Sequence, residues 1–144
     1  MHSIIDGDHL RTRFAYAPRV NLEAKQEGPM TVEMRFPSSA LDVDGQLSIT
    51  TITFTDVLDF RWSDFELGLA RANPRDTGFR LIEITDSALV GEFHREGKIR
   101  DRPCGVIQLE DLHHFRIGFD DHGSYDIVCA GMSFSVAGEA AWVA

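Results

Sequence analysis

The chain has 144 residues, of which 43% are hydrophobic and ten are Phe, enough apolar material for the core of a single domain spanning 1–144. A charged fraction of 26% without a long polar tract argues against a disordered chain. The 14 basic and 23 acidic side chains give a net charge of −9, which argues against a nucleic-acid partner because Lys and Arg bind the phosphates.

The first fourteen residues, MHSIIDGDHLRTRF, carry acidic side chains and lack an apolar run of signal-peptide length. No stretch reaches the ~18 consecutive apolar residues of a membrane helix. We therefore expect a cytoplasmic protein with no membrane contact, in which thiols stay reduced. The spacing of Cys104 and Cys129 matches no zinc motif, and we interpret both as ordinary thiols, with Cys129 in the core.

Strand signals dominate the first half of the chain. A weak one lies at 13–17, and period-two alternation predicts a strand over 29–37. Asp44-Gly45 predicts a two-residue hairpin turn, after which 46–62 is rich in β-branched and aromatic residues. Its apolar register shifts midway, which indicates a bulge or bend.

The middle of the chain carries one helix signal and one hairpin signal. The stretch Ser63-Asp64-Phe65-Glu66 matches a capping box and predicts a short helix over 64–72, with a strand end and loop as the alternative. The segments 79–84 and 88–95 flank the polar turn at 85–87, and we predict that they form a second hairpin.

A third hairpin surrounds FDDHGSYD at 119–126. A three-residue loop of Asp121, His122 and Gly123, with Gly123 in the left-handed region, pairs Phe119 with Tyr125 and turns the apolar side chains inward. The outward face then receives His114, Arg116, Gly118, Asp126 and Val128, with Arg116 diagonal to Asp126. The polarity of this stretch is explained by turn formation alone.

These elements predict a mainly β fold, an antiparallel sandwich or partly open barrel built from hairpins with at most one or two short helices. A parallel nucleotide-binding sheet is disfavoured, because the sequence shows neither strand–helix–strand alternation nor a Gly-rich phosphate loop.

Two clusters are candidates for metal binding. His113, His114 and His122 lie near two acids, but neighbouring strand residues point to opposite faces, so this group fails on geometry unless the strand bends. Glu92, His94 and Glu96 share one face of the strand predicted at 88–95, where a solvated surface is the simpler interpretation. We assign no metal, no cofactor and no catalytic residue, since no nucleophile motif is present.

The segments LEDLHHFRIGFDDHGSYDIVC (109–129) and ITFTDVLDFRWSDFE (52–66) resemble the hairpins of small bacterial all-β proteins. Some of those proteins are similar to the immunity partners of secreted toxins. The resemblance covers about a third of the chain and rests on hydrophobic pattern and a polar turn. It implies a compact, acidic, cytoplasmic, non-enzymatic binder, and a negative charge suits a basic toxin.

We therefore expect a non-catalytic acidic binding protein, with neutralisation of a basic toxin as its most specific form. The alternative is a small-molecule-binding β-barrel or sandwich, or a metal-dependent enzyme. The expected partner is a protein or a second copy of the chain, paired through strand edges or apolar faces. The residues predicted to make binding contacts are His114, Arg116, Asp126, Glu92 and His94.

Overall fold

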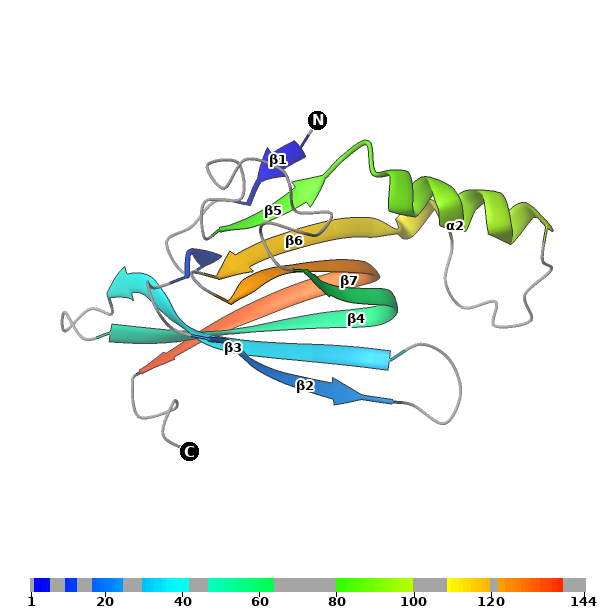
Figure 1. Ribbon diagram of the computed structural model, residues 1–144. Helices are drawn as coiled ribbons and strands as arrows, with labels where there is room; N and C mark the ends of the chain where they lie inside the picture. Colours follow the sequence, from blue (N-terminus) through cyan, green and yellow to red (C-terminus); the bar gives the residue numbers. More distant parts are fainter. Residues whose placement is uncertain are drawn as a thin grey trace.

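The computed structural model describes residues 2–5, 10–12, 17–24, 30–41, 47–63, 80–99, 109–119 and 122–138. Within these ranges, seven strands form one open antiparallel sheet in the order β1-β5-β6-β7-β4-β3-β2 (Figure 1). The strands are β1 (His2–Ile4), β2 (Arg19–Glu23), β3 (Met30–Leu41), β4 (Leu47–Ser63), β5 (Leu81–Ile84), β6 (His113–Phe119) and β7 (Gly123–Gly138). The helix α2 (Ala88–Ile99) and the 3-10 helix η2 (Leu109–Asp111) connect β5 to β6. The prediction of a mainly β fold is confirmed.

The two longest strands, β4 and β7, bend and fold the sheet over itself. In β4, Asp56 adopts a left-handed φ of 53° and the pairing with β7 shifts register between Val57 and Asp59. In β7, a Cβ at Gly131 would lie 2.6 Å from Oγ1 of Thr55, so a larger residue there would displace the Thr55 hydroxyl. Figure 1 shows both strands turning back at the same end of the molecule. The bulge predicted within 46–62 is confirmed.

The core lies between the two layers of this folded sheet. Phe36 on β3 and Phe119 on β6 are three strands apart, about 14 Å in a flat sheet at ~4.8 Å per strand. Their ring centroids are nevertheless only 5.4 Å apart, because the layers face each other. The strand predicted over 29–37 contributes every second side chain to this core, as expected: Val32, Met34 and Phe36 are all fully buried.

A short segment, residues 10–12, crosses the open side of the fold. Thr12 forms an isolated bridge with Ser38 at the end of β3, and its Oγ1 donates to the Gly118 carbonyl of β6 at 3.3 Å. Arg11 forms a second bridge, with Arg80 just before β5. The segment therefore links strands that lie far apart in the sheet order.

The β6–β7 hairpin forms with the predicted faces but a different register. Phe119 pairs with Gly123 rather than Tyr125, so Arg116 lies directly opposite Asp126 instead of diagonally. Gly123 has the predicted left-handed φ, at 80°. A Cβ on Gly123 would lie 2.4 Å from the carbonyl oxygen of Ser63 on β4. Gly123 is therefore the first paired residue of β7, packed against β4, and not a loop residue as predicted.

The predicted strand at 88–95 is wrong, because this segment is the first part of α2. The Ser87 hydroxyl caps the helix by accepting the Val90 N–H at 3.2 Å. Leu89, Val90 and Phe93 follow helical spacing rather than alternation. The place beside β5 is taken instead by β1, with His2 opposite Ile84.

Several predictions fall outside the described residues. These are residues 13–16 of the strand predicted at 13–17, the turn at Asp44-Gly45, the helix at 64–72 and the environment of Cys104. Cys129 is fully buried, as predicted. Within the described ranges, no helix has the length and apolar character needed to cross a membrane.

Candidate functional site

A pocket of about 350 Å³ lies where the end of β5, the first turns of α2 and the start of β6 meet. The capping residue Ser87 and the helix residues Val90, Gly91 and His94 share one face of α2, since Val90 and Gly91 lie three or four residues from each of the other two. The polar side chains of the whole lining are those of Glu83, Thr85, Asp86, Ser87, His94, His113 and His114.

A row of hydrogen bonds runs from the pocket wall into the outer face of the sheet. Ser87 Oγ lies 2.6 Å from His114 Nδ1, and His114 Nε2 lies 2.6 Å from Oδ1 of Asp126. The guanidinium of Arg116 donates to the same Oδ1 at 2.8 Å. The Asp126 side chain is completely buried and that of Arg116 is 11% exposed, so this is a buried ion pair.

Asp126 is kept ionised by its partners. Burial acts to raise the pKa of this carboxyl, because it removes water from the charged form. The hydrogen bond from His114 and the charge and hydrogen bond of Arg116 outweigh that effect, so the pKa lies below its ordinary value. Within the described part of the chain, Oδ2 of Asp126 has no hydrogen-bond partner, so all the stabilising contacts converge on Oδ1.

The same outer face continues onto β4, where Arg61 lies opposite Asp126. Arg61 forms an ion pair with Asp59 at 2.8 Å. Its pKa is raised mainly by the hydrogen bond with Asp59, with smaller electrostatic contributions from Asp59 itself, Glu92 and Asp126, against an opposing effect of burial. Glu92 on α2 therefore lies within electrostatic range of this face.

A second pair of a histidine and a carboxylate, His113 with Glu83, also lines the pocket. Nδ1 of His113 and Oε1 of Glu83 are 2.5 Å apart, and the His113 ring stacks on Phe115 at 5.7 Å. His113 and His114 thus point to opposite faces of β6, as expected for neighbours on a strand. Both nevertheless line the pocket, because it wraps around the start of β6.

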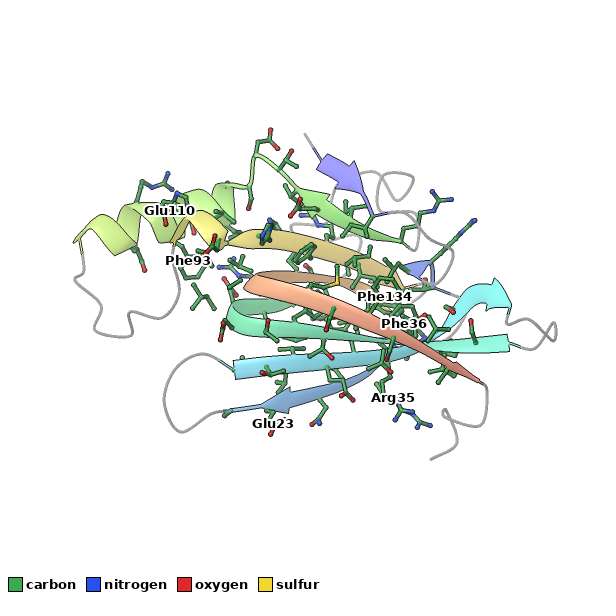
Figure 2. All side chains as sticks on the ribbon, turned by 180° about the vertical axis from the view of Figure 1, so that it is seen from behind. Glu23, Arg35, Phe36, Phe93, Glu110 and Phe134 are labelled. Carbon is green, nitrogen blue, oxygen red and sulfur yellow. The ribbon has the colours of Figure 1, made fainter. Side chains whose placement is uncertain are left out.

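Exposed carboxylates lie on the segments that form or adjoin the pocket, and one of them, Asp86, lines it. Figure 2 shows Glu110 of η2 lying beside α2. We call the set the acidic rim, and its exposed members are Asp86, Glu92, Glu96, Glu110 and Asp111. Arg95 is an exposed basic side chain on the same helix.

The structure brings together some of the residues predicted to bind and separates others. His114, Arg116 and Asp126 are in direct contact, although His114 and Asp126 are buried rather than solvent-facing as predicted. Glu92 and His94 do not share a strand face. They lie on α2, with His94 in the pocket wall and Glu92 on the exposed surface. Their expected binding role is untouched by these positions and stays a prediction.

Ser87, Glu83 and His113 were not predicted as site residues. Ser87 carried a readable signal, since a serine directly before apolar residues at helical spacing is typical of a helix start. Glu83 carried none, because its contact with His113 depends on the pairing of β5 with β6.

The Ser87–His114–Asp126 row has the connectivity of a serine nucleophile with its base and orienting acid. Its geometry serves a structural purpose, because the Ser87 hydroxyl already accepts the helix N–H of Val90. That hydroxyl can also donate to Nδ1 of His114 in the tautomer whose Nε2–H donates to Asp126. The row thus fastens the start of α2 to the sheet. Among the residues whose placement is described, no group of three His, Cys, Asp or Glu side chains could hold a metal ion.

No protein-family model, curated protein or solved structure matches the chain. The class of the protein is therefore defined by its own fold and site. It is an open, folded antiparallel sheet with a polar pocket beside its one α-helix in the described ranges, and exposed carboxylates lie on that helix and on the segments next to it.

Proposed function

We propose that the protein is a non-catalytic acidic binding protein that captures a basic protein partner at the pocket beside α2. Neutralisation of a basic toxin, as in immunity proteins, is the most specific form of this proposal. The observation that carries it is the set of exposed carboxylates on the segments that form or adjoin a pocket of about 350 Å³, whose own lining includes Glu83 and Asp86.

The chemistry of the pocket suits a cationic side chain. Lys and Arg carry long apolar stems beneath a charged head, and the lining offers both kinds of surface. Val90 and Leu112 provide apolar wall, while Glu83 and Asp86 provide carboxylates. A partner's Arg or Lys inserted here would lie close to these two carboxylates.

The buried row beneath the pocket supports rigidity of the site. Because Ser87 caps α2 and bonds to His114, the helix start is fixed relative to β6 and β7. A pre-formed site loses less conformational entropy on binding, which raises affinity without additional contacts.

The test is kinetic. The protein is isolated gently from a lysate of the source cells, and native mass spectrometry identifies any bound partner. The partner is then purified, and its association rate with the protein is measured over a range of salt concentrations. We expect the rate to fall about tenfold or more as salt rises, because steering by the acidic rim is screened beyond the Debye length of ~10 Å at 0.1 M.

Charge reversal locates the contact. Glu92→Lys and Glu110→Lys, both in the rim, are expected to slow association. The matched control is Glu23→Lys on β2, which changes net charge equally at the opposite edge of the sheet (Figure 2). Equal effects of rim and control variants, or an association rate indifferent to salt, would contradict the proposed site.

The pocket volume favours one second candidate, a small-molecule site, since ligand pockets are ~300–1,000 Å³. In that case the native mass spectrum would show a small added mass, and His94→Ala would remove it while Glu92→Lys would not. This outcome would replace the protein-binding proposal.

A further inference from the structure

The C-terminal half of β7 is an edge of the folded sheet. β6 pairs with β7 only as far as Cys129, opposite His113. From Gly131 to Gly138, β7 pairs with β4 on one side, and no other described strand lies on its second side. Within the described ranges, then, no strand pairs with the backbone groups of that second side, which form an edge for a further strand.

This edge lacks the usual protection against pairing. Edge strands are normally guarded by charged side chains or proline. The stretch Ala130–Gly138, AGMSFSVAG, contains neither, although 26% of the chain is charged. All six residues from Ser133 to Gly138 are exposed to solvent.

The edge also presents uncovered apolar side chains on its core-facing side. Met132 pairs with Phe54 and Phe134 with Ile52, and both β4 residues are fully buried. Phe134 itself is 46% exposed and Val136, two residues further along the same face, is 40% exposed. The core-facing side of β7 therefore extends beyond the opposite layer, which leaves Phe134 and Val136 partly exposed.

We infer that this edge binds a second copy of the chain by antiparallel strand pairing about a two-fold axis. Two copies of net charge −9 repel one another over most of their surfaces, but AGMSFSVAG is an uncharged stretch through which they can meet. The side-chain pattern also suits self-pairing, because a two-fold axis beside Ser135 places Phe134 of one copy opposite Val136 of the other, twice.

This dimer is independent of the proposed partner site, which lies beside β5, β6 and α2. The acidic rim would remain accessible in both copies. Success or failure of either idea leaves the other standing, because the dimer is tested on the purified chain alone.

Sedimentation equilibrium of the purified chain over a wide concentration range is the first measurement. We expect a monomer–dimer equilibrium. Ser135→Lys places like charges face to face at the axis and should raise the dimer Kd at least about tenfold. Leu22→Lys is the control, since Leu22 is an exposed apolar residue on the other edge strand, β2, and should leave the Kd unchanged.

Oxidative cross-linking tests the register. In a Cys104→Ser background, Ser135→Cys should give a disulfide-linked dimer, because the axis brings the two copies of residue 135 together. Ser133→Cys, equally exposed, faces Ala137 of the other copy and should not cross-link. A wild-type chain that remains monomeric at every concentration, or a Ser135→Lys variant that dimerises as the wild type does, overturns the inference.

Discussion

The buried pair of Arg116 and Asp126 makes the sharpest prediction about stability. Asp126→Asn keeps the shape of the side chain and keeps a carbonyl oxygen in the position of Oδ1, where the donors from His114 and Arg116 converge. The new amide group takes the position of Oδ2, which has no partner within the described residues. The substitution therefore removes mainly the charge.

The expected loss is large because Arg116 would be left uncompensated. The side chain of Arg116 is 11% exposed and that of Asp126 is 0% exposed, so water solvates the unpaired guanidinium only poorly. Breaking a buried pair by removing one member costs about 3–5 kcal/mol. That is a substantial part of the ~5–15 kcal/mol by which domains are stable.

Urea denaturation followed by fluorescence measures this loss as a shift of the unfolding midpoint at constant slope. The matched control is Asp59→Asn, which removes the same charge from the pair with Arg61, where Arg61 is 44% exposed. Exposed pairs contribute only about 0–1 kcal/mol. Adding Arg116→Gln to Asp126→Asn should restore part of the stability. A loss no larger than that of Asp59→Asn would refute the reasoning.

The remaining predictions concern pH, the helix cap, two glycines and the thiol. Because folding lowers the pKa of Asp126, its stabilising contribution is complete above the unfolded value of ~3.9 and is lost as pH falls through the lower folded value. Acid titration should accordingly show the stability gap between wild type and Asp126→Asn closing below that pH; a constant gap would contradict the assignment. Ser87→Ala should cost about 1 kcal/mol through the lost cap, and Ser87→Thr should retain most of it in urea melts. Gly123→Ala should destabilise the fold by more than about 1 kcal/mol, since its φ is positive and its Cβ would meet the Ser63 carbonyl. Gly91→Ala, in the interior of α2 with room for a Cβ, should instead stabilise it by about 0.5–1 kcal/mol, and thermal melts showing the same sign for both would be inconsistent with this geometry. Burial raises the pKa of Cys129 to about 12, so in a Cys104→Ser background the native protein should react with a thiol reagent only as fast as it unfolds.

Local sequence predicted the strands whose two faces differ in polarity. Alternation identified β3 and the β6–β7 hairpin, and it put His114, Arg116 and Asp126 on one face, because side chains of a strand necessarily alternate. The shift of apolar register within 46–62 likewise indicated the bend of β4. Alternation did not indicate which strands face each other across the core, such as β3 and β6, whose Phe36 and Phe119 are in contact.

The local sequence was misleading at 88–95, where the apolar residues fit both the two-residue period of a strand and the 3.6-residue period of a helix. ALVGEFHR contains apolar residues that suit a strand beside β5 as well as a helix. The decision for α2 came from the Ser87 cap and from β1, which occupies that edge of β5 from the other end of the chain. A contact between such distant segments has no local signature.

The sequence alone thus determined the fold class, the acidic character of the protein and the placement of His114, Arg116 and Asp126 on one face of the hairpin. Tertiary structure decided the hairpin register, the burial of Asp126 and the pocket. The physical reason is the range of the interactions: alternation and turn chemistry act between near neighbours. The register, by contrast, depends on Gly123 packing against the backbone of Ser63, and the pocket depends on α2 being fastened across β6 and β7 by Ser87 and His114.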